Sequence, residues 1–330
     1  EASAHARCVG AVGVNSGTSA LTIALQALGI GPGDEVIVPA FTFVGSVNAI
    51  LAAGAAPVLV DVDPQTLQID PNAVESMIGP RTRAVMAVHL YGRSADVFSL
   101  RSLTQVHELA LIEDACEALG ATCDGHPVGA IGDSGAYAFF PNKVVAAGEG
   151  GVILVRDTDV LTRCRQLRNQ GFDPVSGTYH QDLPGVSARM SEWHAAIASV
   201  QFARLDAALA RRQRLADYYA TLLVGDARIE PSVASDLTDR VSWFTYPIRL
   251  SPELAMHRDA VISRLIAAGI GSNRYFSPVH QLPFHRGRHR CAPLPISDDI
   301  GRRCLALPLH ASMQEGDVAH VCATLRDVLQ

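Results

Sequence analysis

Four short apolar runs in the first third of the chain constrain its fold more than any other feature. They lie at residues 36–38, 58–60, 85–88 and 109–112. The apolar residues in these runs are continuous and do not alternate with polar ones, which is typical of strands covered on both faces in a parallel sheet. The segments between the runs are long enough for crossover helices. The sequence therefore predicts a doubly wound α/β fold, with a mainly parallel sheet flanked by helices, over residues 11 to about 160.

The last third of the chain changes character. An arginine-rich helix is predicted from about residue 208 to 223, and a strand near 244–250 and two amphipathic helices follow it. A chain of 330 residues is long enough for two domains. We therefore expect a large domain over residues 1–207 and a smaller C-terminal α/β domain over residues 208–330. The chain starts at Glu1 inside a predicted helix, so we expect that an N-terminal segment of the protein precedes it.

Charge and cysteine content narrow the class of protein. The formal net charge is −6 and no basic cluster occurs, so nothing favours nucleic-acid binding. The seven cysteines are scattered without a CxxC pair, a pattern typical of reduced thiols in the cytoplasm rather than of a zinc site or a disulfide framework. Residues 36–60 carry no charge, but prolines and Asn48 interrupt them, so we expect buried core there rather than a membrane span.

The chain contains one lysine, Lys143, and all its other fixed cations are arginines. A lysine amine can lose its proton and form a Schiff base, whereas a guanidinium stays protonated. Lys143 follows a predicted apolar strand at 136–140 and precedes the segment GEGG at 148–151, whose glycines let the backbone approach a ligand closely. Functional groups often lie on loops at strand ends. Lys143 is therefore a candidate catalytic amine, the alternative being an incidental surface lysine.

A second motif, NSGTSAL at 15–21, precedes or opens a predicted helix. It brings Gly17, Thr18 and Ser19 to the helix start, where free N–H groups, the helix dipole and hydroxyl groups together suit a phosphate. An ordinary helix N-cap has the same composition, so both interpretations stay open.

Two more residues follow strands at their carboxyl ends, where ligands bind in such sheets. Asp114 ends the run at 109–112, and a carboxylate there could hold the protonated ring nitrogen of pyridoxal phosphate or cap the next helix. Phe43 follows the run at 36–38, and its ring could stack on a flat cofactor or belong to the core. A phosphate cradle, an acidic residue and a lone lysine in this chain order favour a pyridoxal phosphate enzyme.

The sequence resembles the nucleotide-sugar aminotransferase family of the DegT/StrS type, which has the fold-type I pyridoxal phosphate architecture. The matching segments run in family order over nearly the whole chain: SGTSAL at 16–21, VPAFTFV at 38–44, VDVDPQTLQID at 60–70, VHLYGRSAD at 88–96, EDACEALGA at 113–121, FFPNK…GEGG at 139–151, RMSEWHAA at 189–196, and YFSPVHQLP with LALPLH near the end.

The resemblance implies a role for each candidate residue. Lys143 would form a Schiff base with pyridoxal 5'-phosphate, the internal aldimine, and later transfer protons. Asp114 would bind the pyridinium nitrogen and Phe43 would stack on the ring. Backbone amides of Thr18 and Ser19, beside Gly17, would hold the phosphate.

Five further positions follow from the same resemblance. Glu117 would lie near the phenolic oxygen of the cofactor, where it would need protonation or a hydrogen-bonding partner. Tyr275 and His280 would belong to the substrate pocket. Ala138 stands where many relatives have a serine that donates to the phosphate, and Ser187 stands where relatives usually have an asparagine that reaches the partner subunit's phosphate. We therefore expect weaker cofactor binding than is typical, or a compensating donor.

The resemblance implies a ping-pong transaminase that moves an amino group from L-glutamate to a keto group of a nucleotide-linked deoxysugar. It also implies a homodimer with active sites at the subunit interface. The charge, the cysteine spacing and the interrupted apolar stretch described above favour no metal, no nucleic acid and no membrane. One alternative is a glutamine-dependent aminotransferase of a keto-cyclitol. Another is a noncatalytic pyridoxal phosphate-binding regulatory protein, although Lys143 and Asp114 are present.

Overall fold

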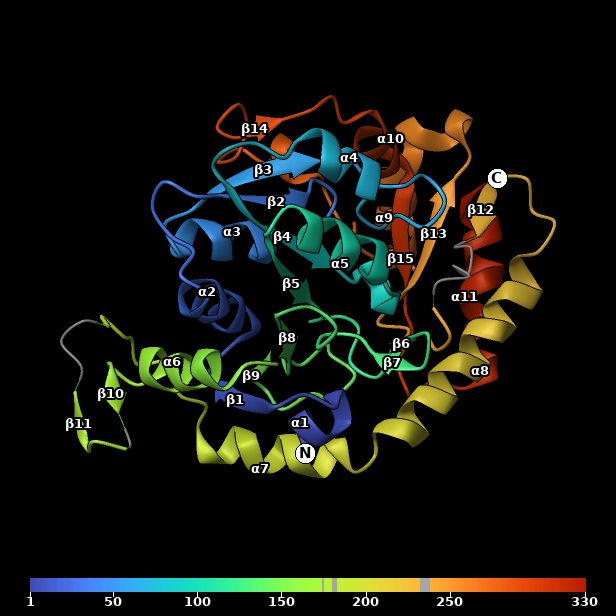
Figure 1. Ribbon diagram of the computed structural model, residues 1–330. Helices are drawn as coiled ribbons and strands as arrows, with labels where there is room; N and C mark the ends of the chain where they lie inside the picture. The colour runs from blue at the N-terminus through green and yellow to red at the C-terminus, as the bar shows by residue number, and fades with distance from the viewer. Residues whose placement is uncertain (174, 180–182, 232–237) are drawn as a thin grey trace.

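The computed structural model describes residues 1–173, 175–179, 183–231 and 238–330. Its large sheet has eight strands (Figure 1). Its pairings are parallel from β8 to the edge strand β14, while β9 is antiparallel to both β8 and β1. The predicted mainly parallel sheet is thereby confirmed. In spatial order the strands are β1 (Gly10–Val14), β9 (Gly151–Val155), β8 (Ser134–Ala138), β5 (Ala110–Asp114), β4 (Thr82–Val88), β2 (Glu35–Pro39), β3 (Ala56–Val60) and β14 (Arg290–Cys291).

Helices cover both faces of this sheet, which explains the continuous apolar runs. On β2, Val36 and Val38 join the hydrophobic cluster of one face, and Ile37 between them joins the cluster of the other. Successive side chains of a strand point to opposite faces, so a strand buried on both sides needs apolar residues at every position. The first face carries α2 (Gly17–Ala27), α3 (Val44–Ala52) and α6 (Thr158–Arg168); the second carries α1 (Ala2–Ala6), α4 (Pro71–Ser76), α5 (Val97–Val106) and α7 (Glu192–Phe202).

A third hydrophobic cluster lies in the C-terminal part of the chain. It surrounds a three-stranded antiparallel sheet of β12 (Ile229–Pro231), β13 (Tyr246–Leu250) and β15 (Cys304–Leu307). The helices packed there are α8 (Leu205–Leu223), α9 (Arg258–Ala267) and α11 (Glu315–Val328). The long helix α8 runs along this part in Figure 1.

The remaining elements are short. One of them, α10 (Pro295–Arg303), leads into β15. The others are η1 (Leu90–Gly92), η2 (Pro252–His257), η3 (Val279–Gln281), β6 (Thr122–Cys123), β7 (His126–Pro127), β10 (Phe172–Asp173) and β11 (Thr178–Tyr179).

The expected division after residue 207 falls inside α8, two residues after its start. The chain does not stay within the small sheet after that point, because Val279 N donates to Ala40 O and β14 pairs with β3 of the large sheet. The segment 279–291 therefore binds the two parts of the chain together. The domain boundary stays a prediction.

Residues 36–60, the uncharged stretch, form β2, α3 and β3 and are largely buried, as expected. Across the described part of the chain, no helix combines the length and the apolar character needed to cross a bilayer. The cytoplasmic location stays a prediction.

Candidate active site

A cavity of about 430 Å³ lies at the carboxyl ends of β2, β5 and β8. Most of the residues singled out from the sequence line it, although they come from distant segments of the chain. These are Gly17, Thr18, Phe43, Asp114, Glu117, Lys143 and Tyr275. The structure therefore brings together the candidate amine, the candidate acids and the glycine-containing helix start in one place.

One end of the cavity is formed by the N-terminus of α2. Ser16 is the N-cap, and its hydroxyl oxygen accepts from Ser19 N at 3.1 Å. A Cβ atom on Gly17 would lie 2.8 Å from Cys116 Sγ and 2.9 Å from Ala138 Cβ, so only glycine allows this close approach. The helix has eleven residues, and its first amides and its dipole favour an anion at this end.

Asp114 lies deeper in the cavity, at the last position of β5, and is 7% exposed. Ser46 on α3 donates to Asp114 Oδ2 at 2.6 Å, and Cys116 N donates to Oδ1 at 3.1 Å. Each carboxylate oxygen thus has one neutral donor, which fixes its orientation and leaves lone pairs for a further donor. No ion pair to Asp114 is present among the described residues, so a cationic N–H would find an unneutralised partner there.

The amine of Lys143 lies between an acid and an aromatic ring. Its Nζ is 3.8 Å from Glu117 Oε1 and 4.3 Å from the centre of the Phe244 ring. The side chain is 15% exposed, and Lys143 N donates to Phe140 O at 2.9 Å in a turn after β8. A charged amine is attracted to both neighbours, by Coulomb interaction and by the ring quadrupole. These contacts hold Nζ inside the cavity.

The sequence required either protonation of Glu117 or a hydrogen-bonding partner, and the structure supplies a partner. Burial raises the pKa of its carboxyl group, because desolvation disfavours the charged form, and the nearby Lys143 amine opposes that shift. Tyr91 N donates to Glu117 Oε2 at 3.0 Å. The acid therefore has a backbone donor on one oxygen, and its protonated form can donate from the other to an anionic oxygen in the cavity.

Phe43 stands at the rim of the cavity as the first residue before α3. Its side chain is 54% exposed, and its ring centre lies 5.6 Å from that of Phe276 at an angle of 51°. An aromatic ring so exposed contributes little to the core. Its open face can instead stack on a planar ligand.

Three predicted site residues do not line the cavity. The Ser19 amide and hydroxyl bond to Ser16 in the helix cap. His280 Nε2 lies 2.8 Å from Asp298 Oδ1, and Ser187 is exposed and forms a β-bridge with Asn169. Their roles, and the expectation of weaker cofactor binding, stay predictions.

The sequence did not single out Ser46, Cys116, Asn142 or Phe244, all of which line the cavity. Ser46 had a local signal, since it follows the FTFVG segment at a strand end. Phe244 had none, because it lies about a hundred residues from Lys143 and reaches it only through the fold.

This fold and site define an aminotransferase. Residues 1–326 match the DegT/DnrJ/EryC1/StrS aminotransferase family, and the chain belongs to that family. The resemblance seen in the sequence is thereby confirmed, and the protein is an enzyme.

Similar proteins agree with this assignment. The chain is 42% identical over 321 residues to GDP-perosamine synthase of Caulobacter vibrioides, covering 97% of this chain and 85% of that protein. It is 39% identical to UDP-N-acetyl-3-dehydro-alpha-D-glucosamine 3-aminotransferase of Acidithiobacillus ferrooxidans, covering 96% and 84%. The crystal structure of S. venezuelae DesV in complex with a ketimine intermediate superposes with a TM-score of 0.91 at 37% identity, covering 98% and 86%.

Proposed function

We propose that the protein is a pyridoxal 5'-phosphate-dependent aminotransferase that moves an amino group from L-glutamate to a keto group of a nucleotide-linked deoxysugar. The observation that carries the proposal is that the only lysine of the 330 residues lies in one cavity with Asp114 and the start of α2. The names of the two relatives above each include a nucleotide-linked sugar, which supports this class of acceptor.

The donors in the cavity fit the cofactor. The α2 N-terminus suits its phosphate, because the first amides and the dipole of this helix favour an anion. Asp114 would hold the ring nitrogen in its protonated form, and Phe43 would cover one face of the ring. When bound, the cofactor supplies an aldehyde that accepts the amino group and a ring that withdraws electrons.

The residues around Lys143 set its role in proton transfer. Lys143 Nζ would take the proton from the α-carbon of the donor and later deliver a proton to the former keto carbon of the acceptor. The Phe244 ring lies against Nζ and excludes water from that side of the amine. Glu117, held by Tyr91 N, would donate a proton to an anionic ring oxygen without moving.

The visible absorbance of the protein loaded with pyridoxal 5'-phosphate tests the proposed function. We expect L-glutamate to shift the visible absorbance of the cofactor-loaded protein, and a nucleotide-linked keto-sugar to restore it. A much larger response to L-glutamine than to L-glutamate would favour the keto-cyclitol acceptor instead. If cofactor binds and no amino acid changes the absorbance, the noncatalytic alternative gains and the proposed function is wrong.

We also infer that the protein works as a homodimer. The helix α7 carries Trp193, Ile197 and Val200 on one face, at positions that meet on a helix surface. These residues are 83%, 46% and 55% exposed, so this apolar face points away from the core. In Figure 1, α7 lies along the outer edge of the molecule, beside α1. A second copy of the chain would bury this face, since an exposed apolar face of this kind is typical of a protein interface.

Charges on this face should break the dimer. With Trp193→Asp and Ile197→Asp combined, we expect the mass measured by light scattering to fall from that of two chains to that of one, because two carboxylates would be buried unpaired. The matched control is Val106→Asp on α5, which is 79% exposed and far from α7 in the sequence. A dimer that survives the double change, or that Val106→Asp disrupts equally, would contradict the inference.

A further inference from the structure

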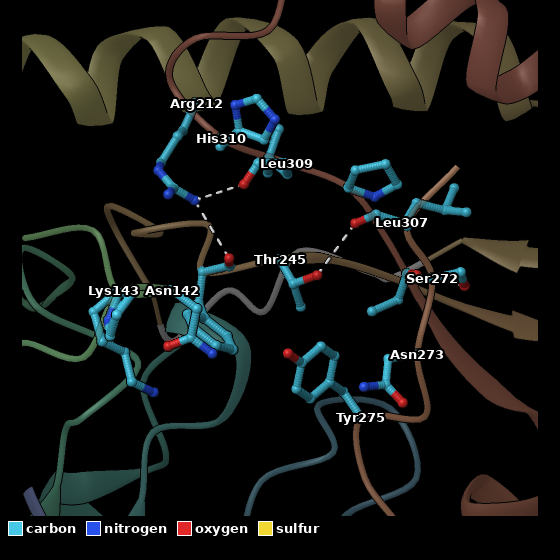
Figure 2. Close-up of a pocket in the computed structure, with 15 residues that line it drawn as sticks. Asn142, Lys143, Arg212, Thr245, Ser272, Asn273, Tyr275, Leu307, Leu309 and His310 are labelled. Carbon is cyan, nitrogen blue, oxygen red and sulfur yellow. Dashed lines mark hydrogen bonds between the residues drawn. The ribbon is translucent and has the colours of Figure 1, made fainter. Parts of the chain in front are cut away.

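A second cavity, of about 590 Å³, adjoins the first on the side of the small sheet. The two cavities share Asn142, Lys143, Phe244, Asn273 and Tyr275. Figure 2 shows the far end of the second cavity, where Arg212, Leu309 and His310 meet, with Lys143 and Asn142 along its side. Lys143 thus stands at the junction of the two spaces.

The two cavities differ in charge. Asp114, Glu117 and Glu149 line the first, whereas no carboxylate is found among the described residues that line the second. Arg212 and Lys143 give the second cavity a positive balance. An anion entering from solvent is therefore favoured in the second cavity and disfavoured beside the acids of the first.

Arg212 is a buried cation without a counter-ion in the described part of the chain. Its residue is 5% exposed, and Nη1 donates to the carbonyl oxygens of Trp243, Phe244 and Leu309 at 2.6, 3.3 and 2.9 Å. Its Nε is buried and has no hydrogen-bond partner. Burial lowers the pKa of Arg212 to about 10, because desolvation disfavours the charged form. Such a group gains strongly from an anionic ligand.

Two of the neutral hydroxyl groups in the cavity already donate to backbone carbonyl oxygens. Thr245 Oγ1 donates to Leu307 O at 3.2 Å, and Ser272 Oγ donates to Ala306 O at 2.9 Å. They cannot donate to a ligand in this arrangement, since each hydroxyl has one hydrogen. Apart from Lys143, Arg212 is the one fixed cation among the described residues that line the second cavity, so we assign recognition of the charge of an anion to it.

We propose that the second cavity is the binding site for the amino donor, with Arg212 holding one of its carboxylate groups while the amine of the donor faces Lys143. This inference rests on the proposed function. A carboxylate is planar and accepts two parallel hydrogen bonds, which matches the remaining N–H groups of a guanidinium whose Nη1 is occupied. The diphosphate of a sugar nucleotide has related chemistry, and the experiment below separates the two sources.

Two changes test the site by different routes. Arg212→Gln removes the charge but keeps an N–H donor for the carbonyl oxygens. His310→Glu leaves Arg212 in place and adds a carboxylate beside it, at an exposed residue that follows Leu309. The matched controls are Arg211→Gln, whose side chain donates to Met313 O outside both cavities, and His320→Glu, an exposed histidine on α11.

The readout is the rate of the absorbance change of each cofactor-loaded variant, measured at increasing concentrations of L-glutamate. This series gives the concentration for half-saturation and the maximal rate separately. We expect half-saturation to rise about tenfold or more in Arg212→Gln and in His310→Glu, with a smaller change in maximal rate, because a charge-assisted hydrogen bond is lost or repelled. Half-saturation for a nucleotide-linked keto-sugar should stay within about twofold in the second half-reaction, which starts from the aminated cofactor, and the controls should match the wild type.

Each other outcome has one meaning. Unchanged half-saturation for L-glutamate in both variants overturns the proposal, and so does a loss confined to the keto-sugar, which would assign Arg212 to the diphosphate. If Arg212→Gln fails to fold, His310→Glu decides alone, since it alters an exposed position. A wild-type protein that responds to no amino acid would instead reject the proposed function, so the two failures are distinct.

Discussion

Lys143→Ala is expected to abolish transamination, lowering the rate of both half-reactions by more than about 10³-fold. The change removes the amine that would bind the cofactor covalently and transfer protons. No other lysine in the 330 residues could replace it. The measurement is the absorbance change of the loaded variant on addition of L-glutamate, followed over hours rather than seconds.

Lys143→Arg is the matched variant for this prediction, because it keeps a positive charge beside Glu117 and Phe244 but cannot form a Schiff base. Both variants should be inactive. Borohydride treatment of the loaded wild type should place a label on the peptide that contains Lys143 and on no other side chain. Activity in Lys143→Arg near that of the wild type would show that the charge alone suffices, and would contradict the proposed chemistry.

The large sheet was predictable because its strands are buried on both faces. A run such as 36–38 must be apolar at every position when Val36 and Val38 pack on one side and Ile37 on the other. The return of the chain to this sheet at β14 was not predictable. That strand has two residues, Arg290 and Cys291, whose pairing with β3 depends on the course of the preceding forty residues.

The candidate site divides in the same way. Gly17, Asp114 and Lys143 were found because each lies at the end of a strand or the start of a helix, where the local sequence shows its position. Phe244 and Arg212 were missed as functional residues. Their neighbours in sequence are an ordinary strand and an arginine-rich helix, and only the tertiary fold brings the two residues together at the second cavity.

Two acidic residues of the first cavity, Asp114 and Glu117, have different surroundings that the sequence alone did not show. Asp114 is fixed by two neutral donors, Ser46 and Cys116 N, and keeps lone pairs free for a cation. Glu117 is buried, its pKa is raised, and its one backbone donor comes from Tyr91. The two carboxyl groups, three residues apart, are thus suited to accept a hydrogen bond from a cation in one case and to donate a hydrogen bond in the other.

Asp114→Asn should therefore lower the maximal rate of the L-glutamate half-reaction by about 10²-fold or more. The amide oxygen can still accept from Cys116 N, and the Ser46 hydroxyl can rotate to accept from the amide nitrogen, so the cavity should keep its shape. It carries no charge, however, and cannot stabilise a protonated ring nitrogen in a buried site. The measurement is the single-turnover rate at saturating L-glutamate, with cofactor content determined for each sample.

Two further variants establish whether charge at this position is the cause. Ser46→Ala removes one donor to Asp114 but leaves the charge, so a loss of about tenfold or less is expected. Asp133→Asn changes a carboxylate at the other end of the sheet, just before β8. Asp133 accepts hydrogen bonds from the Arg101 side chain and from Leu111 N. This change should affect stability more than rate. If Asp133→Asn slowed the loaded enzyme as much as Asp114→Asn did, the loss would reflect the integrity of the sheet, and the assignment of Asp114 to the ring nitrogen would fail.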